Sequence, residues 1–165
     1  MVVDKKKSFK YFLILVLLLG IVLVIYISKN EFKKKNIINI DPIVINLLTS
    51  VHPSLSWNFK PAEPKITVIP GEITSVEYLV ENLGDKTTSG IATFSYFPKK
   101  FGEYISKLNC FCYDAQTLRP NQKSKYYVVL LIDPEVTKDS KTRNIKEFTI
   151  QFTFFDYKEY KENKS

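Results

Sequence analysis

Hydrophobic and polar positions divide the chain into two parts. Residues 11–28 form an uninterrupted apolar stretch without a charged side chain, and lysines lie on both sides of it. After residue 36 no segment keeps the 3.6-residue period of an amphipathic helix, and apolar positions alternate with polar ones in short runs. The pattern therefore predicts one apolar helix followed by a β-rich region.

The β-rich region consists of short runs separated by proline, glycine and asparagine. Alternate positions share an apolar face in 73–81, in 91–97 and again in 145–155. Residues 126–132 are continuously apolar, which is typical of a strand buried on both faces. About seven such runs predict an all-β fold, an immunoglobulin-like β-sandwich domain preceded by one N-terminal transmembrane helix.

The apolar stretch is long enough for a membrane anchor. Its eighteen residues span about 27 Å as a helix, close to the ~30 Å core of a bilayer. No small-x-small cleavage site follows it, so we expect an uncleaved signal-anchor. The predicted organisation is a basic cytoplasmic tail at 1–10, a transmembrane signal-anchor at 11–28, a linker at 29–50, an immunoglobulin-like copper-binding domain at 51–157 and a polar tail at 158–165. Within the linker, residues 36 to about 50 fit either a linker or a first edge strand.

The formal net charge of +7 lies almost entirely in the N-terminal arm. Residues 1–35 carry a net charge of +6, and residues 36–165 carry +1. Nucleic-acid-binding domains carry their positive field on the folded surface, so this distribution argues against a nucleic-acid partner. The arm also contains aspartate and no arginine, unlike a mitochondrial transit peptide. We therefore expect a single-pass protein of a bacterial inner membrane. Four lysines lie on each side of the apolar stretch, so charge alone does not set the orientation. Because the anchor is N-terminal and the foldable region follows it, we expect a cytoplasmic N-terminus and a periplasmic C-terminal domain.

Cys110 and Cys112 are the strongest candidates for chemistry. In an extended strand their side chains share one face and their Cα atoms lie roughly 6.6 Å apart, near the upper limit for a disulfide. The spacing thus disfavours an intrachain disulfide, and two thiolates on one face suit a soft ion such as Cu(I). Two small apolar side chains in a strand fit the spacing equally well. Thiol–disulfide exchange is a third option.

Other features of the sequence predict no catalytic machinery. The single histidine, His52, lies beside a proline and is expected in a turn, and it excludes any site that needs two histidines from one chain. Glu77 and Glu81 are expected on a solvated strand face, and Trp57 in the core. No phosphate-binding glycine loop, nucleophile elbow or metalloprotease helix is present in the sequence.

Several sequence blocks resemble the family of CtaG-type cytochrome c oxidase assembly proteins. They are LSWNFKP at 55–61, PGE at 70–72, KLNCFCY at 107–113, TLRP at 117–120, IDPE at 132–135 and FTIQFTFF at 148–155. The resemblance implies an immunoglobulin-like domain outside the inner membrane that binds Cu(I) and helps deliver it to the copper–haem centre of oxidase subunit I. By the motif match, Cys110 and Cys112 are the copper ligands.

The resemblance leads us to expect a copper chaperone, not an enzyme. Its partners would be cytochrome c oxidase subunit I and an unknown copper donor, and a homodimer would pool four thiolates. We expect Lys107 to supply positive charge beside the copper. The family's third cysteine after the membrane span has no counterpart here, and Tyr126–Tyr127 stand where the family has Met-Pro. The alternatives are an anchored interaction module with structural cysteines and a thiol oxidoreductase.

Overall fold

The computed structural model describes residues 5–34 and 40–163, and the chain divides into one unit of residues 1–39 and a second of residues 40–165. Each unit is described by itself. In the helix of the first unit, the described side chains are those of Phe9 and residues 14–27. The predicted basic tail, linker and polar tail each fall partly outside the described residues.

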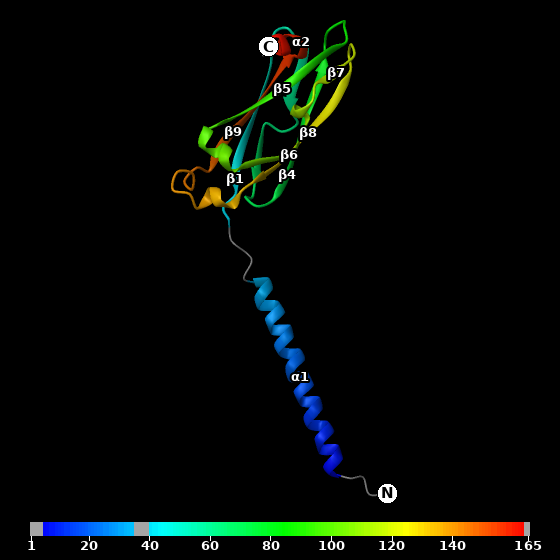
Figure 1. Ribbon diagram of the computed structural model, residues 1–165, viewed down its shortest axis with the longest axis vertical. Coiled ribbons are helices and arrows are strands. Elements are labelled where there is room, and N and C mark those ends of the chain that lie inside the picture. Colours follow the sequence, from blue (N-terminus) through cyan, green and yellow to red (C-terminus); the bar gives the residue numbers. More distant parts are fainter. Residues whose placement is uncertain (1–4, 35–39, 164–165) are drawn as a thin grey trace. The chain divides into compact units, whose positions relative to one another are not determined.

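The first unit contains the predicted helix. This helix, α1 (Lys5–Lys34), is drawn in blue in Figure 1 and includes the whole apolar stretch 11–28. Side chains 14–27 are all exposed. Among the described residues, which include only the side chains of Phe9 and residues 14–27 of α1, no helix is long and apolar enough to cross a membrane. The helix is therefore confirmed, whereas its role as a membrane anchor stays a prediction.

The described part of the second unit is mostly β-structure in two sheets (Figure 1). The first sheet has the strand order β3 (Lys65–Val68), β1 (Ile43–Val51), β9 (Glu147–Asp156), β5 (Thr88–Phe97) and β7 (Gln116–Leu118). The second has the order β2 (Trp57–Pro61), β4 (Ile73–Asn82), β8 (Lys123–Ile132) and β6 (Ile105–Cys110). Neighbouring strands are antiparallel except β1 and β9, which are parallel.

Short helices complete the second unit. Three are 3-10 helices, namely η1 (Lys99–Tyr104), η2 (Phe111–Tyr113) and η3 (Pro134–Thr137), and the fourth is α2 (Tyr157–Glu162). The side chain of Asp156 caps α2, because its Oδ1 accepts hydrogen bonds from the N–H groups of Lys158 (2.9 Å) and Glu159 (3.1 Å). Part of the predicted polar tail at 158–165 is therefore an ordered helical turn.

An aromatic core joins the two sheets. The ring centroids of Phe59 in β2 and Phe154 in β9 are 4.8 Å apart, and those of Tyr78 in β4 and Phe152 in β9 are 5.3 Å apart. Trp57 is also buried, as predicted. The Tyr78 hydroxyl is buried without a hydrogen-bond partner among the described residues, and burial raises the pKa of this group. The predicted mostly-β, two-sheet architecture is confirmed.

Two predictions about the strands of this unit need correction. Residues 43–50 of the predicted linker lie in β1, so the alternative of a strand holds, but β1 is not an edge strand because it pairs with β3 on one side and with β9 on the other. The run 126–132, predicted to be buried on both faces, is buried on only one, since Val128 and Leu130 are buried whereas Tyr127 is 47% exposed. Val129 and Leu131 on the outer face are half-buried, so apolar composition alone overstated the burial of this face.

Candidate metal centre

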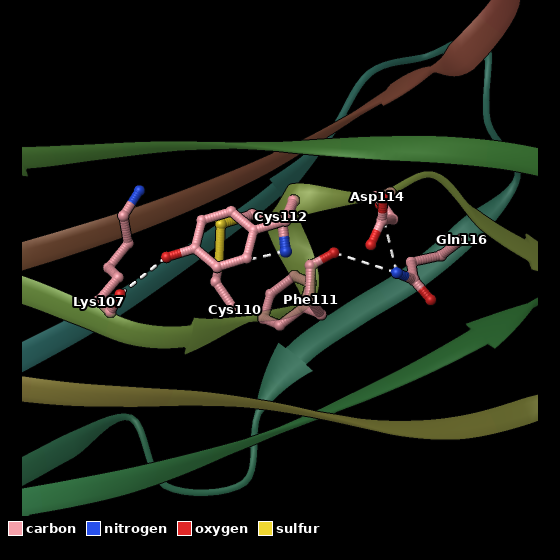
Figure 2. The surroundings of a disulfide bond; sticks show 7 residues. Lys107, Cys110, Phe111, Cys112, Asp114 and Gln116 are labelled. Carbon is pink, nitrogen blue, oxygen red and sulfur yellow. Dashed lines mark hydrogen bonds between the residues drawn. A yellow bond between two sulfur atoms is a disulfide. The ribbon is translucent and has the colours of Figure 1, made fainter.

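The two cysteines lie where the chain crosses from one sheet to the other. Cys110 is the last residue of β6, an edge strand of the four-stranded sheet. Cys112 lies in η2, after which the chain enters β7, an edge strand of the five-stranded sheet. Cys110 is buried and Cys112 is partly buried. We call residues 110–114 the cysteine turn, which Figure 2 shows with its neighbours.

A disulfide joins Cys110 and Cys112, and this overturns the expected pair of free thiols in an extended strand. Their Cα atoms are 5.0 Å apart, well inside the usual range of about 4.4–6.8 Å for a disulfide. The distance is short because the extended backbone ends at Cys110 and the chain turns into η2. The prediction was wrong because it assumed extended backbone through Cys112, but it did place both sulfurs together.

Phe111 anchors the cysteine turn in the core. Its side chain is 8% exposed and its ring centroid lies 4.9 Å from that of Phe152, 5.4 Å from Tyr126 and 5.5 Å from Tyr78. These three partners belong to β9, β8 and β4. The residue between the two cysteines is therefore held by strands of both sheets, and this fixes where the sulfur atoms lie.

Hydrogen bonds tie the cysteine turn to its surroundings. Within it, Cys112 N–H donates to Cys110 Sγ at 3.1 Å. The Tyr113 hydroxyl donates to the backbone carbonyl of Lys107 at 2.8 Å. Gln116 Nε2 donates to the carbonyls of Phe111 (3.1 Å) and Asp114 (3.2 Å). The sequence did not predict a role for Tyr113 or Gln116, because no residue pattern identifies side chains that donate hydrogen bonds to the backbone carbonyls of a turn.

Lys107 brings a positive charge to the cysteine turn. Its Nζ lies 4.3 Å from the ring centroid of Phe94 and 5.9 Å from that of Tyr113, the residue after Cys112. Partial burial lowers the pKa of the Lys107 ammonium group. The aromatic rings compensate some of the lost hydration, because their faces attract cations.

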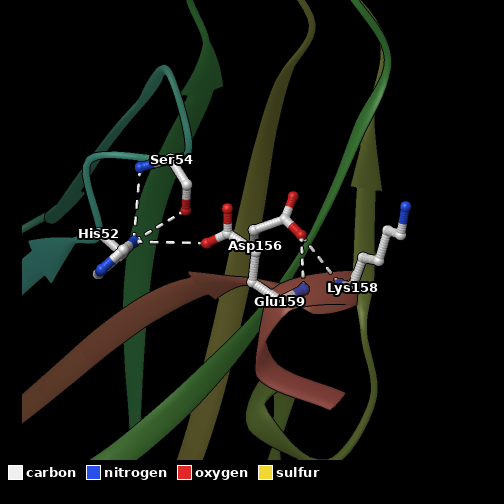
Figure 3. Close-up of polar contacts among 5 residues, drawn as sticks. All are labelled: His52, Ser54, Asp156, Lys158 and Glu159. Atoms are coloured by element: carbon white, nitrogen blue, oxygen red, sulfur yellow. Dashed lines mark hydrogen bonds and ion pairs between the residues drawn. The ribbon is translucent and has the colours of Figure 1, made fainter. Parts of the chain in front are cut away.

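The other predicted residues lie in surface contacts. Figure 3 shows His52, whose Nδ1 is 2.8 Å from Ser54 Oγ and 3.9 Å from Glu159 Oε2. Its ring stacks on Phe155 at 5.6 Å, and none of its described contacts is with a cysteine. His52 therefore belongs to the surroundings of α2. Both nearby oxygens lie beside the same ring nitrogen, which is not the arrangement of a catalytic triad.

The two glutamates of β4 lie on a solvated strand face, as predicted. Glu77 pairs with Lys125 at 3.0 Å and Glu81 pairs with Lys123 at 3.4 Å. Hydrogen bonds from the Tyr127 hydroxyl and from Lys125 lower the pKa of Glu77. Among the described residues, no group of three or more His, Cys, Asp or Glu side chains is placed to hold a metal ion. The two cysteines thus remain the candidate donors.

The cysteine pair can be a disulfide or two thiols, and these two states differ in whether they can bind a metal ion. As a disulfide it has no thiolate to offer a metal ion. A dithiol reductant converts it to two thiols by exchange, in which the reductant gives two hydrogen atoms and closes its own disulfide. After loss of their protons the two sulfurs form a soft donor pair, which suits Cu(I) as a two-coordinate cargo and leaves Zn²⁺ short of its usual four ligands.

Comparison with known proteins reveals clear relatives. The family described as cytochrome c oxidase assembly protein CtaG/Cox11 matches residues 21–156, which include both cysteines. Over 117 residues the chain is 38% identical to the Bos taurus "Cytochrome c oxidase assembly protein COX11, mitochondrial", covering 71% of this chain and 42% of the bovine protein. Over 117 residues it is 40% identical to CtaG of Ehrlichia ruminantium (strain Gardel), covering 71% and 66% of the two chains.

A third relative is also a CtaG protein of similar identity. The chain is 37% identical over 115 residues to CtaG of Sinorhizobium fredii, covering 70% of this chain and 58% of that protein. The matched region spans 42% of the bovine relative's length and 66% of the Ehrlichia relative's. The similarity to these three proteins therefore concerns part of each.

Proposed function

The chain belongs to the cytochrome c oxidase assembly protein CtaG/Cox11 family, and we propose from this that it is a copper chaperone for the oxidase, not an enzyme. In this proposal Cys110 and Cys112 bind Cu(I) and deliver it to the copper–haem centre of cytochrome c oxidase subunit I. One observation carries the proposal: both cysteines lie on one turn, with their sulfur atoms bonded and their Cα atoms 5.0 Å apart, within the region that matches the family. We also propose that the two-sheet fold of the second unit is an immunoglobulin-like β-sandwich.

Copper binding begins from the reduced turn. Two thiols release two protons as they take up one Cu⁺, and the resulting centre carries a net charge of −1. The Lys107 ammonium, held at the turn by Phe94 and Tyr113, offsets this charge. A two-coordinate Cu(I) has open positions, so a ligand of the acceptor attaches before a cysteine leaves. Because protons are released on binding, copper affinity increases with pH.

The membrane anchor belongs to the same proposal. The stretch 11–28 is uncharged and lies within α1, and its length as a helix suits a bilayer core. With the N-terminus in the cytoplasm and the second unit in the periplasm, the protein would diffuse in the plane of the inner membrane. Its acceptor is then a membrane protein whose copper site is reached from the periplasmic side. The copper donor is unidentified, and a homodimer would share four thiolates.

Anaerobic Cu(I) titration of the full chain in detergent tests the proposal. We expect the dithiol form to bind one Cu(I) per chain, and Cys110→Ser and Cys112→Ser each to lose most of the binding. The disulfide form should bind none, and Ala115→Ser, which adds a hydroxyl next to the cysteine turn, should bind like the wild type. Full-strength binding by either cysteine variant would rule out the paired-ligand site.

A thiol oxidoreductase is the second candidate, and the disulfide itself favours it. Such a protein would take electrons from one dithiol and pass them to a disulfide in another protein. The two functions differ in turnover: an oxidoreductase reduces many equivalents of a disulfide substrate without copper. A chaperone reacts once with the reductant and then holds Cu(I). Multiple turnovers without Cu(I) binding would favour the oxidoreductase.

A further inference from the structure

The side chains of Tyr113 and Gln116 connect the cysteine turn to the two sheets by hydrogen bonds. Neither is a ligand in the proposed copper site. Through its bond to the Lys107 carbonyl, Tyr113 ties the turn to β6. Through its bonds to the Phe111 and Asp114 carbonyls, Gln116 ties the turn to the start of β7. Figure 2 shows the bond at Lys107 on one side of the disulfide and the bonds at Gln116 on the other.

Burial does not explain the position of either side chain. The Tyr113 side chain is 54% exposed, and Gln116 is only partly buried. The hydrogen bonds therefore do more to place these groups than packing does. Both β6 and β7 are edge strands of their sheets, so the turn connects two edges that no further strand supports among residues 40–163.

We propose that Tyr113 and Gln116 are positioning residues, which hold the cysteine turn so that its two sulfur atoms face each other. A turn that is already ordered has lost the backbone freedom that binding would otherwise have to remove. Its sulfurs therefore close a disulfide or bind one Cu(I) more favourably than those of a mobile turn. The copper half of this inference rests on the proposed function, whereas the disulfide half does not.

Two conservative variants test the inference in the full chain. Tyr113→Phe removes the hydroxyl and keeps the ring, and Gln116→Met keeps the length and removes the donor. The matched controls are Tyr127→Phe, whose hydroxyl donates to Glu77 Oε2 at 2.7 Å, and Gln151→Met, whose Nε2 donates to Ser50 Oγ at 3.3 Å. Both control bonds lie outside the cysteine turn.

Two equilibria are measured for each variant. The first is anaerobic exchange with dithiothreitol, in which the protein disulfide and the reduced reagent give the protein dithiol and the cyclic oxidised reagent. It needs no copper. The second is competition for Cu(I) against a chromogenic chelator. Urea unfolding followed by Trp57 fluorescence checks that every variant keeps its fold.

We expect Tyr113→Phe and Gln116→Met, the two site variants, each to change both equilibrium constants by about 2- to 10-fold, which corresponds to the net contribution of one hydrogen bond. The disulfide should be reduced more readily, and Cu(I) should be held more weakly. The controls should change less than about 2-fold on the same scale. If Gln116→Met unfolds, Tyr113→Phe decides the test, because it removes one atom from an exposed ring.

The outcomes separate this inference from the proposed function. Wild-type exchange and wild-type copper binding in Tyr113→Phe and Gln116→Met would overturn the positioning role and leave the copper chaperone intact. Shifted exchange in a protein that binds no Cu(I) at all would support the positioning role and overturn the copper function. Equal shifts in the site variants and the controls would also overturn the positioning role.

Discussion

The ring of Phe111 connects the stability of the sandwich to the geometry of the cysteine turn, and its removal should be costly. Its side chain is 8% exposed and packs against rings from both sheets, with the closest centroid, that of Phe152, at 4.9 Å. Deleting a buried phenylalanine ring removes its transfer free energy and leaves a cavity, which together amount to about 3–5 kcal/mol. We therefore expect Phe111→Ala to lower the free energy of unfolding by that amount.

Equilibrium urea unfolding measures this loss. Trp57 is the single tryptophan of the chain and is buried, so its fluorescence reports the unfolding of the second unit. The measurement is made on the disulfide form, so that the covalent link between Cys110 and Cys112 is the same in every variant. Since single domains are stable by only about 5–15 kcal/mol, the midpoint should move to much lower urea.

Two further variants control the experiment. Phe97 is 74% exposed, so Phe97→Ala removes the same atoms from the surface and should change stability by less than about 0.5 kcal/mol. Phe111→Leu keeps much of the apolar volume and should cost clearly less than Phe111→Ala. If Phe111→Ala is as stable as Phe97→Ala, the ring does not anchor the cysteine turn in the core and the packing argument fails.

The remaining predictions concern pH, topology and the oxidase. A hydrogen bond from the Tyr104 hydroxyl lowers the pKa of Asp139. This hydrogen bond therefore stabilises the folded protein fully above about pH 4, the pKa of aspartate in the unfolded chain. The stabilisation is lost as the pH falls through the lower pKa that Asp139 has in the folded protein. In Tyr104→Phe the melting temperature should fall less steeply between neutral and acidic pH than in the wild type. The same dependence of melting temperature on pH in both proteins would contradict this prediction. A reporter fused after Ser165 should be active if it works only outside the cytoplasm, whereas activity of a cytoplasm-only reporter there would reverse the proposed orientation. Oxidase purified from cells with the Cys110→Ser/Cys112→Ser protein should contain haem but lack the neighbouring copper, and full copper occupancy at low external copper would favour the interaction module.

Alternation of apolar and polar residues was enough to predict which segments bury one face. Alternation in 73–81 and 145–155 predicted the strands β4 and β9, because side chains of a strand point to opposite sides and only one side of each enters the core. The uncharged stretch 11–28 likewise predicted a helix, which α1 contains. The spacing of Cys110 and Cys112 identified the candidate metal centre, since no other pair of soft donors exists in the sequence.

The pairing of strands and the bends of the backbone between them depend on contacts between residues far apart in the sequence. Residues 43–50 looked like a linker because their partner β9 lies about a hundred positions later in the chain, at a register such as Ile45 opposite Phe148. The disulfide was missed because spacing does not encode the turn at Cys110. That turn is fixed by packing of Phe111 against β4, β8 and β9 and by the bonds from Tyr113 and Gln116. Periodicity records local burial, whereas these contacts exist only after distant strands have come together.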